Sequence, residues 1–355
     1  LSSRSYLPKM IKLGIVGTGG ISHWHAEEFK KIKGVEIVAA CDINEKVLEA
    51  FANQYDIKNK FLSVDQMLSE VELDAVANTT PDSFHKDIAL KVLNHNYHIF
   101  SEKPLAENYP DALEMCNATK AKSLINMVNF SYRNSSGFQG LSKIVRSGEL
   151  GAVKHVDAIY YQSWLTCRYW GDWRTDDTWL WRLSTKHGSN GVLGDLGVHI
   201  FDFATYPVGK IKRLNCLLKT FKDKGERINQ YVLDANDTFL SMVEFDNGAT
   251  GMITSTRFAT GYKNRLELQV FCDKGGVRVR IPDGDYFEIT RNIDSEHMFW
   301  KKVNVENTPN NFERFIESIE TGIYDQPDFE RGAEIQKILD SCFESSNSLR
   351  WVDIN

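Results

Sequence analysis

Residues 11–22 read IKLGIVGTGGIS, and this stretch decides the fold of the chain. An apolar run of the kind that forms a buried parallel strand, Ile11–Val16, leads directly into a glycine-rich turn and then into helical spacing from Ser22. In such a unit the glycines allow a tight turn and a close approach to a pyrophosphate, which the helix N-terminus stabilises. The third fingerprint position is Ser22, which is small enough for close helix packing. The context predicts a dinucleotide-binding loop whose contact residues are Gly17, Thr18, Gly19, Gly20 and Ile21.

The second strand of this unit ends at Cys41 and is followed by Asp42, which lies 25 residues after Gly17. An acid near this position hydrogen-bonds the ribose hydroxyls of an adenosine. A carboxylate there would repel a 2′-phosphate, and no arginine follows, so we expect NAD rather than NADP. The competing interpretation is that Asp42 only caps the helix that begins near Asn44.

Residues 10–130 alternate between short apolar runs and stretches with three- and four-residue apolar spacing. The pattern predicts a doubly wound parallel sheet, a Rossmann domain. The expected strands are Ile11–Val16, Val35–Cys41, Asp74–Asn78, Tyr97–Phe100 and Leu124–Val128. The expected helices are Ser22–Lys31, Glu45–Tyr55, Ser83–Asn94 and Tyr109–Thr119.

The pattern changes after about residue 130, and residues 131–355 predict a second, α+β domain. Turn signals such as DNG at 246–248 and PDG at 282–284 separate strand-like runs between Ile211 and Lys302, which favours a large, mainly antiparallel open sheet. A strand is also expected at Val153–Ser163, and residues 164–190 are irregular and aromatic. The expected helices are Gly137–Gly148, Leu193–Tyr206, Asn311–Thr321 and Phe329–Ser345, and we expect the last two to pack back on the Rossmann domain.

The composition is that of a globular protein, with 42% hydrophobic and 25% charged residues in a chain of 355. The formal net charge of -6 gives no reason to expect nucleic acid or an anionic membrane as a partner. No apolar run is long enough to span a bilayer. The six cysteines include no CxxC pair and are expected to be reduced thiols in the cytoplasm. We expect Met10 to be the natural start, with Leu1–Lys9 a loose or added tail.

Three further motifs follow the phosphate loop in a specific order: TTP at 79–81, SEKP at 101–104 and GVLGDLGVH at 191–199. Together they resemble the Gfo/Idh/MocA oxidoreductase family, which includes glucose–fructose oxidoreductase and inositol dehydrogenases. The resemblance extends from Ile11 to about Ser345. Many members have a Gly-Gly-Gly run where this chain has Ser189, Asn190 and Gly191, a variation that the family also contains.

The EKP motif, Glu102 to Pro104, follows a parallel strand and therefore lies at the carboxyl edge of the sheet, where such folds bind ligands. The resemblance implies that Lys103 reaches both the nicotinamide ribose and the reacting hydroxyl, where an ammonium lowers the cost of alkoxide charge. It also implies a cis bond before Pro104. The cofactor contacts that it implies on this side are Thr79, Thr80, Pro81, His85, Glu102 and Lys103, although a plain capping or packing role for His85 is an equal alternative.

Asp195 and His199 are four residues apart, so on a helix they share one face. A carboxylate neighbour fixes the tautomer of a histidine and stabilises its imidazolium, which suits a base that removes a hydroxyl proton. The resemblance implies that His199 is this general base and that Asp195 orients the substrate or the histidine. The competing interpretation is a surface ion pair on a helix.

A second group of polar and aromatic residues borders the expected active site. Aromatic faces stack on the C–H faces of sugar rings, and arginines bind hydroxyls or carboxylates. The candidate substrate-binding residues are Tyr132, Arg133, Trp164, Arg168 and Arg182, with the alternative that any one tryptophan belongs to the core or to a subunit interface. His23 and His25 do not share a helical face, and we expect no metal site.

These residues predict an NAD-dependent oxidoreductase that transfers a hydride between a sugar or polyol hydroxyl and nicotinamide. Inositols, aldoses, anhydrosugars and sugar acids are all open as substrates. Two alternatives remain: an NAD-dependent glycoside hydrolase, and a non-catalytic regulator that senses NAD and a sugar. A homodimer or homotetramer is expected, because the family commonly pairs through the open sheet of its second domain.

Overall fold

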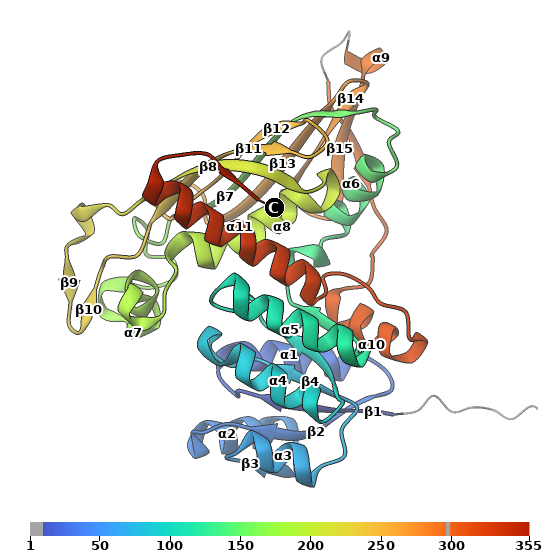
Figure 1. Cartoon of the computed structure of the whole chain (residues 1–355), viewed down its shortest axis with the longest axis vertical. Coiled ribbons are helices and arrows are strands. Elements are labelled where there is room, and N and C mark those ends of the chain that lie inside the picture. The colour runs from blue at the N-terminus through green and yellow to red at the C-terminus, as the bar shows by residue number, and fades with distance from the viewer. Residues whose placement is uncertain (1–9, 296–298, 355) are drawn as a thin grey trace, which may run out of the picture. The chain divides into compact units, whose positions relative to one another are not determined.

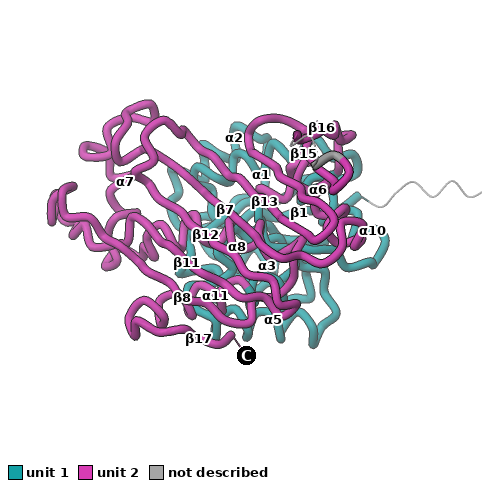
Figure 2. Tube along the Cα trace, turned by 90° about the horizontal axis from the view of Figure 1, so that it is seen from above, with its two compact units in different colours: residues 1–130, 309–334 teal, residues 131–308, 335–355 magenta. Residues whose placement is uncertain are grey.

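The strand predicted at the start of the chain, β1 (Ile11–Val16), lies in the middle of a six-stranded parallel sheet with the order β3-β2-β1-β4-β5-β6. This computed structural model describes residues 10–295 and 299–354, so the expectation about Leu1–Lys9 lies outside the described residues. The chain divides into two compact units (Figure 2). Unit 1 comprises residues 1–130 and 309–334, and unit 2 comprises residues 131–308 and 335–355.

Unit 1 has the doubly wound parallel sheet that the alternating pattern predicts (Figure 1). Its other strands are β2 (Val35–Cys41), β3 (Asn59–Phe61), β4 (Ala75–Asn78), β5 (His98–Ser101) and β6 (Asn126–Val128). Its helices are α1 (Gly20–Lys31), α2 (Glu45–Tyr55), α3 (Val64–Glu70), α4 (His85–Asn94), α5 (Tyr109–Lys122) and α10 (Asn311–Thr321). The sequence pattern did not reveal β3 or α3, because β3 is three residues long with two of them exposed and α3 spans two turns.

One face of this sheet is covered by α1, α2 and α10, whose aromatic side chains form the core of the unit. Phe29, Phe51 and Phe312 come from the three helices, are fully buried, and belong to one cluster with Phe100 of β5. Burying one such ring contributes roughly 1.5–3 kcal/mol. The helix α10 begins with a capping box between Asn310 and Glu313, which satisfies the first backbone donors of that helix.

Unit 2 is built on a nine-stranded sheet with the order β16-β15-β14-β13-β7-β12-β11-β8-β17. The sheet is mainly antiparallel, as predicted. The pair β7–β12 is the parallel one, so the sheet is a mixed sheet. Its strands are β7 (Val153–Gln162), β8 (Ile211–Lys219), β11 (Thr238–Phe245), β12 (Thr250–Thr256), β13 (Asn264–Cys272), β14 (Gly275–Ile281), β15 (Tyr286–Arg291), β16 (Lys301–Asn304) and β17 (Val352–Asp353). A separate hairpin pairs β9 (Arg227–Ile228) with β10 (Tyr231–Val232).

Two helices, α6 (Ser136–Arg146) and α8 (Val198–Val208), pack on each other and on one face of this sheet. All residues of α8 except Tyr206 are buried. This burial holds the first turn of α8, which contains part of the predicted catalytic motif, in a fixed position. The remaining helices are the short α7 (Asp177–Leu180) and α9 (Asn292–Ser295), and α11 (Phe329–Ser348), which contributes to both units.

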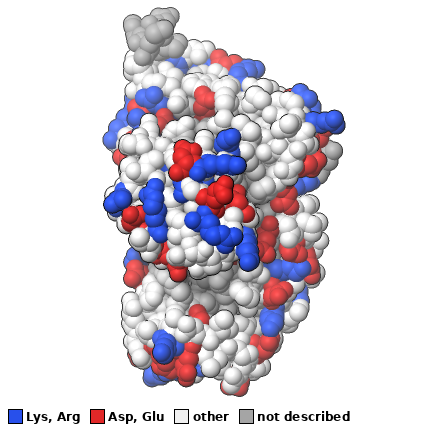
Figure 3. Space-filling model, turned by 90° about the vertical axis from the view of Figure 1, so that its left-hand side faces the viewer, with Lys and Arg blue, Asp and Glu red and all other residues white. Residues whose placement is uncertain are grey.

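Lys and Arg side chains lie interleaved with Asp and Glu side chains on the molecular face shown in Figure 3, so neither sign forms an extended patch there. Within the described residues, no helix is long and apolar enough to cross a membrane.

Candidate active site

The phosphate loop of unit 1 has the conformation that its glycines require. Gly17 has a φ of 85°, and a Cβ atom there would lie 2.8 Å from the backbone nitrogen of Thr80, so a larger residue is excluded. A Cβ atom at Gly19 or Gly20 would meet nothing within 4 Å. The backbone at these two positions is therefore open to a ligand.

Among the residues that the structure describes, no side chain caps the N-terminus of α1. Its N-cap residue is Gly19, and its first turn carries no acidic side chain. The hydroxyl of Ser22 is fully buried and donates to the carbonyl oxygen of Gly19 at 2.5 Å, which keeps the loop tight. Uncapped backbone N–H groups at a helix N-terminus suit a pyrophosphate, so the loop fits the dinucleotide that the sequence predicts.

Asp42 lies beside this loop and organises it. One carboxylate oxygen accepts from the backbone nitrogen of Thr18 at 2.7 Å, and the other accepts from the backbone nitrogen of Asn44 at 2.8 Å. The residue that caps α2 is Asn44, whose side chain accepts from Lys46 and Val47. The Thr18 hydroxyl also donates to Oδ2, at 3.1 Å, so Oδ1 is the oxygen with a lone pair for a ribose hydroxyl in the predicted role.

The TTP segment, residues 79–81, packs against Gly17, the first glycine of the loop. The hydroxyl of Thr79 donates to the carbonyl oxygen of Gly17 at 2.6 Å. His85 is fully buried, and its two ring nitrogens lie 2.8 Å from the carbonyl oxygen of Thr80 and 2.7 Å from that of Pro104. Both ring nitrogens therefore have protein partners, which favours the packing role that was one of the two considered for His85.

The EKP motif follows β5 at the carboxyl edge of the sheet, and the bond before Pro104 is cis, as predicted. Lys103 is half-buried and its backbone nitrogen lies 3.2 Å from Oε2 of Glu102. The Glu102 side chain points into unit 1, where Oε1 accepts from His25 and from Asn129, each at 2.7 Å. Burial alone would raise the pKa of Glu102, but the hydrogen bond and charge of His25, with Asn129 and the charge of Lys103, lower it to about 2.

In unit 2 the predicted catalytic pair lies on one continuous helical segment. Residues Leu193–Gly197 form a π-helical turn that runs into α8, and the backbone N–H of Val198 donates to the carbonyl oxygen of Leu193. Such wide turns are rare and are frequent at functional sites. Asp195 lies in this turn with its side chain 31% exposed, whereas His199 lies in the first turn of α8 and is 7% exposed.

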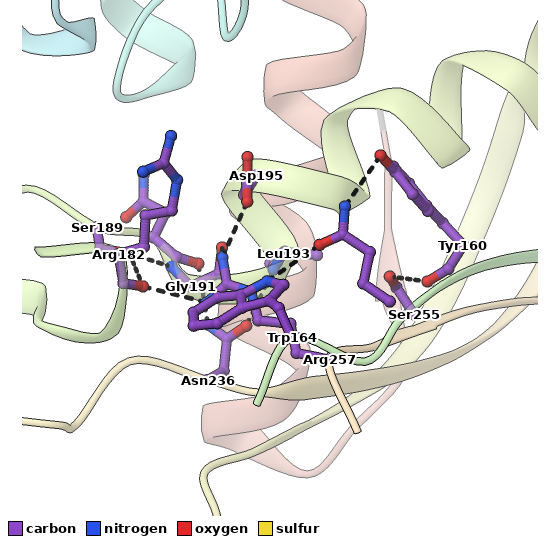
Figure 4. Close-up of polar contacts among 12 residues, drawn as sticks. Tyr160, Trp164, Arg182, Ser189, Gly191, Leu193, Asp195, Asn236, Ser255 and Arg257 are labelled. Carbon is purple, nitrogen blue, oxygen red and sulfur yellow. Dashed lines mark hydrogen bonds and ion pairs between the residues drawn. The ribbon is translucent and has the colours of Figure 1, made fainter. Parts of the chain in front are cut away.

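A residue that the sequence analysis did not single out, Arg257, binds the Asp195 carboxylate. The Nη2 atom of Arg257 lies 3.0 Å from Oδ2 of Asp195, and its Nη1 donates to the carbonyl oxygen of Arg182 at 3.1 Å (Figure 4). The guanidinium is fully buried and lies over the ring of Trp164, 5.0 Å from its centroid. This buried cation holds the Asp195 carboxylate in place.

The turn that carries Asp195 is held from below by Asn236. The side chain of Asn236 accepts from the backbone nitrogen of Leu193 at 3.0 Å and donates to the carbonyl oxygen of Asn190 at 3.0 Å. Gly191 has a φ of 67°, and a Cβ atom there would lie 2.5 Å from the Asn236 side chain. The glycine retained in this motif is therefore required by the close approach of Asn236, as Figure 4 illustrates.

Aromatic side chains surround His199. The ring of Tyr132 lies edge-on at 4.9 Å between centroids, and Tyr160 lies at 6.3 Å. The two tyrosine hydroxyls hydrogen-bond each other, and Asn264 donates to Tyr132 at 3.1 Å. Burial, followed by the proximity of Tyr132, raises the pKa of Tyr160 well above its usual value, so its hydroxyl stays protonated. Tyr132, which was proposed from the sequence as a substrate-binding residue, thus lies beside His199.

The other predicted substrate-binding residues lie in different environments. Arg133 is 1% exposed and forms a two-pronged ion pair with Asp202 at 2.6 and 2.7 Å, so its role in the structure is internal. Arg168 has a 77% exposed side chain paired with Asp172 at 3.3 Å. The guanidinium of Arg182 lies over the rings of Trp179 and Trp181, at 5.3 and 4.6 Å.

The tryptophans of the 164–190 segment form a small core of their own. Trp164 and Trp173 are buried among Leu180, Leu183 and Tyr231, and Trp170 and Trp179 stack at 5.8 Å. Trp164 donates its ring N–H to Gln162 at 3.1 Å. The burial of Trp164 and Trp173 favours the core interpretation, and Trp164 contacts the Asp195 environment through Arg257.

Both parts of the chain match models of known protein families. A model of the Gfo/Idh/MocA oxidoreductase family with an NAD-binding Rossmann fold matches residues 11–130, and a model of the GFO/IDH/MocA C-terminal domain matches residues 138–278. Levoglucosan dehydrogenase from Pseudarthrobacter phenanthrenivorans is 25% identical over 253 residues, a match that spans 66% of this chain and 63% of that protein's length. D-glucoside 3-dehydrogenase from Escherichia coli is 24% identical over 356 residues, with 97% of each chain covered.

A solved structure of levoglucosan dehydrogenase in complex with NADH has a TM-score of 0.87 and 22% identity to this chain. The superposition covers 97% of this chain and 99% of that one, so the two share their fold over nearly their whole length. Fold and site together define an oxidoreductase with an NAD-binding Rossmann domain. The chain belongs to the Gfo/Idh/MocA family.

Proposed function

We propose that this protein is a dehydrogenase that uses NAD to oxidise a hydroxyl of a sugar or polyol, or to reduce the corresponding ketone. The observation that carries the proposal is the Asp195–His199 segment, in which a buried histidine and an arginine-bound carboxylate lie on one helical segment. The names of similar proteins support the substrate class, since they include a levoglucosan, a glucoside and a myo-inositol dehydrogenase.

His199 would act as the general base. The substrate O–H bond breaks and its proton passes to the imidazole, while the C–H bond breaks and its electron pair leaves as hydride. Bound NAD supplies the hydride acceptor. The buried position of His199 between aromatic rings keeps bulk water from competing for the proton.

Lys103 would stabilise the oxygen as it takes on alkoxide character, since an ammonium within reach lowers the cost of that charge. Lys103 belongs to unit 1, and Asp195 and His199 belong to unit 2.

Asp195 would accept hydrogen bonds from the substrate hydroxyls. Its carboxylate is partly exposed, and the contact with the buried Arg257 guanidinium fixes the orientation of its oxygens. Among the predicted contact residues, Tyr132 and Arg182 have the environments that best suit sugar binding, because both offer polar groups beside exposed or half-exposed aromatic surface.

NAD is the proposed cofactor in preference to NADP, because Asp42 presents a carboxylate next to the phosphate loop. We also propose that the enzyme works in a reducing compartment such as the cytoplasm. All six cysteines lie in the described part of the chain and are free thiols.

A homodimer or homotetramer is the proposed assembly. Four exposed apolar side chains lie together on the sheet face of unit 2 opposite α8: Leu217, Leu240, Met242 and Met252. Leu217 is paired with Leu240, and Met242 with Met252, so the four form one patch across β8, β11 and β12. A contiguous apolar patch of this kind is typical of a protein–protein interface.

The test is NADH formation with a panel of inositols, aldoses, anhydrosugars and sugar acids, with aryl glycosides as a second panel. Oxidation of a member of the first panel, with one NADH formed per ketone, supports the proposal and names the substrate. Cleavage of an aryl glycoside without net NADH would instead indicate an NAD-dependent glycoside hydrolase. NAD binding with no turnover in either panel would indicate a sensor.

A further inference from the structure

The least explained polar group in unit 1 is His25, in the second turn of α1. Its side chain is fully buried, although it lies on the helix that starts at the phosphate loop. Four aromatic rings surround it with edge-to-face contacts, at centroid distances of 5.1 to 6.4 Å: Trp24, Phe29, Phe100 and Phe312. Burying a histidine among apolar rings lowers the stability of the fold unless its ring nitrogens are hydrogen-bonded.

His25 hydrogen-bonds Glu102, and the Glu102 carboxylate has further hydrogen-bond partners. His25 Nε2 and Asn129 Nδ2 both lie 2.7 Å from Oε1, and the backbone nitrogen of Lys103 lies 3.2 Å from Oε2. Asn129 is itself held by Asn311 at 3.2 Å. These contacts fix the orientation of the Glu102 carboxylate. Because that carboxylate lies within hydrogen-bond distance of the backbone nitrogen of Lys103, they also constrain the position of the Lys103 backbone.

The two ring nitrogens of His25 differ in their surroundings. In the part of the chain that the structure describes, Nδ1 has no hydrogen-bond partner. The polar contact with Glu102 is made by Nε2, at 2.7 Å from Oε1. Removal of the ring would therefore take away one of the two side-chain partners of this carboxylate oxygen.

We infer that His25 is a positioning residue for Lys103, acting through Glu102. The inference rests on the proposed function, in which Lys103 stabilises the developing alkoxide. His25 fixes the carboxylate that receives the Lys103 backbone N–H, and the same helix begins at the loop that would hold the pyrophosphate. A single rigid element, α1, thus sets both the phosphate loop and the EKP turn.

A double-mutant cycle tests this coupling. His25→Ala should lower kcat by about 10- to 100-fold, because a small misplacement of a catalytic group has effects of that size, with the KM for NAD changed less than about twofold. In a Lys103→Met background the same change should lower kcat by less than about twofold, since the group that it positions is absent. His25→Gln, which keeps an N–H donor, should recover part of the loss. Equal losses in both backgrounds would overturn the inference.

His23→Ala is the matched control, because it removes the same ring from the same helix but His23 contacts Tyr55 instead of Glu102. It should change kcat less than about twofold in either background. A loss in this variant as large as that of His25→Ala would show that any damage to α1 has the same effect, and would also overturn the inference.

A second readout does not depend on turnover and so separates this inference from the proposed function. Acetylation of Lys103 is measured by mass spectrometry across pH, with the exposed Lys58 of the same protein as the internal reference. His25→Ala should change the relative labelling rate of Lys103 by about threefold or more, because the position of its ammonium group changes, and His23→Ala should not. Unchanged labelling in His25→Ala would refute the positioning role, whereas a wild-type protein that turns over no sugar would refute only the proposed function.

Discussion

At the scale of single residues, the chemistry of this protein depends on charges that the fold holds in fixed positions. The carboxylates of Asp42, Glu102 and Asp195 each accept a hydrogen bond from another part of the chain, which fixes their orientation. The sequence motifs identify these acids, because each lies next to a strand or helix terminus with a recognisable pattern. They do not identify the partners, His25 and Arg257, which are 77 and 62 residues away from the acids that they bind.

Asp42 should determine the choice of cofactor. Asp42→Ser is expected to weaken NAD binding by about tenfold, the equivalent of one charged hydrogen bond, and to improve NADP binding because the repelling carboxylate is gone. Asn44→Ala is the control, since it removes the α2 cap at a cost of about 1 kcal/mol of stability and leaves the carboxylate in place. Titration of both cofactors by fluorescence measures the effect, and an unchanged NAD-to-NADP ratio in Asp42→Ser would contradict this role.

Glu102 should contribute to stability against acid. Its pKa is lowered in the folded protein from 4.5 to about 2, so the unfolded chain binds a proton over this range that the folded protein does not. The contribution is complete above about pH 4.5 and is lost as the pH falls towards 2, at a cost of about 3 kcal/mol in all. In denaturant titrations, Glu102→Gln should flatten the fall in stability in this window. Glu49→Gln, at an exposed ion pair, should not, and parallel curves for wild type and Glu102→Gln would exclude the effect.

At the scale of elements, the predictions that succeeded rest on periodicity. The bounds of β1, β2, α2 and α10 agree with those expected from the sequence, because each element has a regular apolar face and a clear start or stop. The expected helix Leu193–Tyr206 is present but begins as a π-helical turn. That widening could not be predicted, because it depends on Asn236, which hydrogen-bonds the turn from another part of the chain.

Gly191 should be essential for this turn. Gly191→Ala would place a Cβ atom 2.5 Å from Asn236 and add the strain of a positive φ, so we expect a loss of at least about 2 kcal/mol in stability and a fall in kcat. Gly188→Ala is the matched control, because Gly188 also has a positive φ of 88° but no atom within 4 Å of the added Cβ. Thermal unfolding and steady-state rates compare the two, and equal effects would mean that backbone strain alone is responsible.

At the scale of the whole molecule, the sequence predicts the two kinds of sheet, but it does not reveal how the strands of unit 2 are ordered. Local turn signals locate hairpins such as β13–β14, whereas the parallel pairing of β7 with β12 joins strands far apart in the chain. The exposed patch on β8, β11 and β12 is also a property of this ordering. It exists because four apolar residues from three strands meet on one face.

That patch predicts the response of the assembly to a charge. Met242→Asp should shift the protein from dimer or tetramer towards monomer, because an isolated carboxylate is costly to bury in an apolar interface. Leu62→Asp is the matched control, because Leu62 is an exposed apolar residue of unit 1 that lies outside the patch, and it should leave the mass unchanged. Light scattering after size exclusion measures the mass, and a wild-type monomer, or a Met242→Asp variant with the wild-type mass, would contradict the proposed interface.

The measurement that tests the central claim most directly is NADH formation by wild-type protein and by His199→Ala with the sugar and polyol panel, with NAD binding measured in parallel. The account predicts turnover of at least one panel member by wild type. It also predicts a loss of about 100-fold or more in His199→Ala, as expected for a general base, with NAD affinity unchanged. Turnover by His199→Ala at the wild-type rate would contradict the assignment of the base and the mechanism built on it.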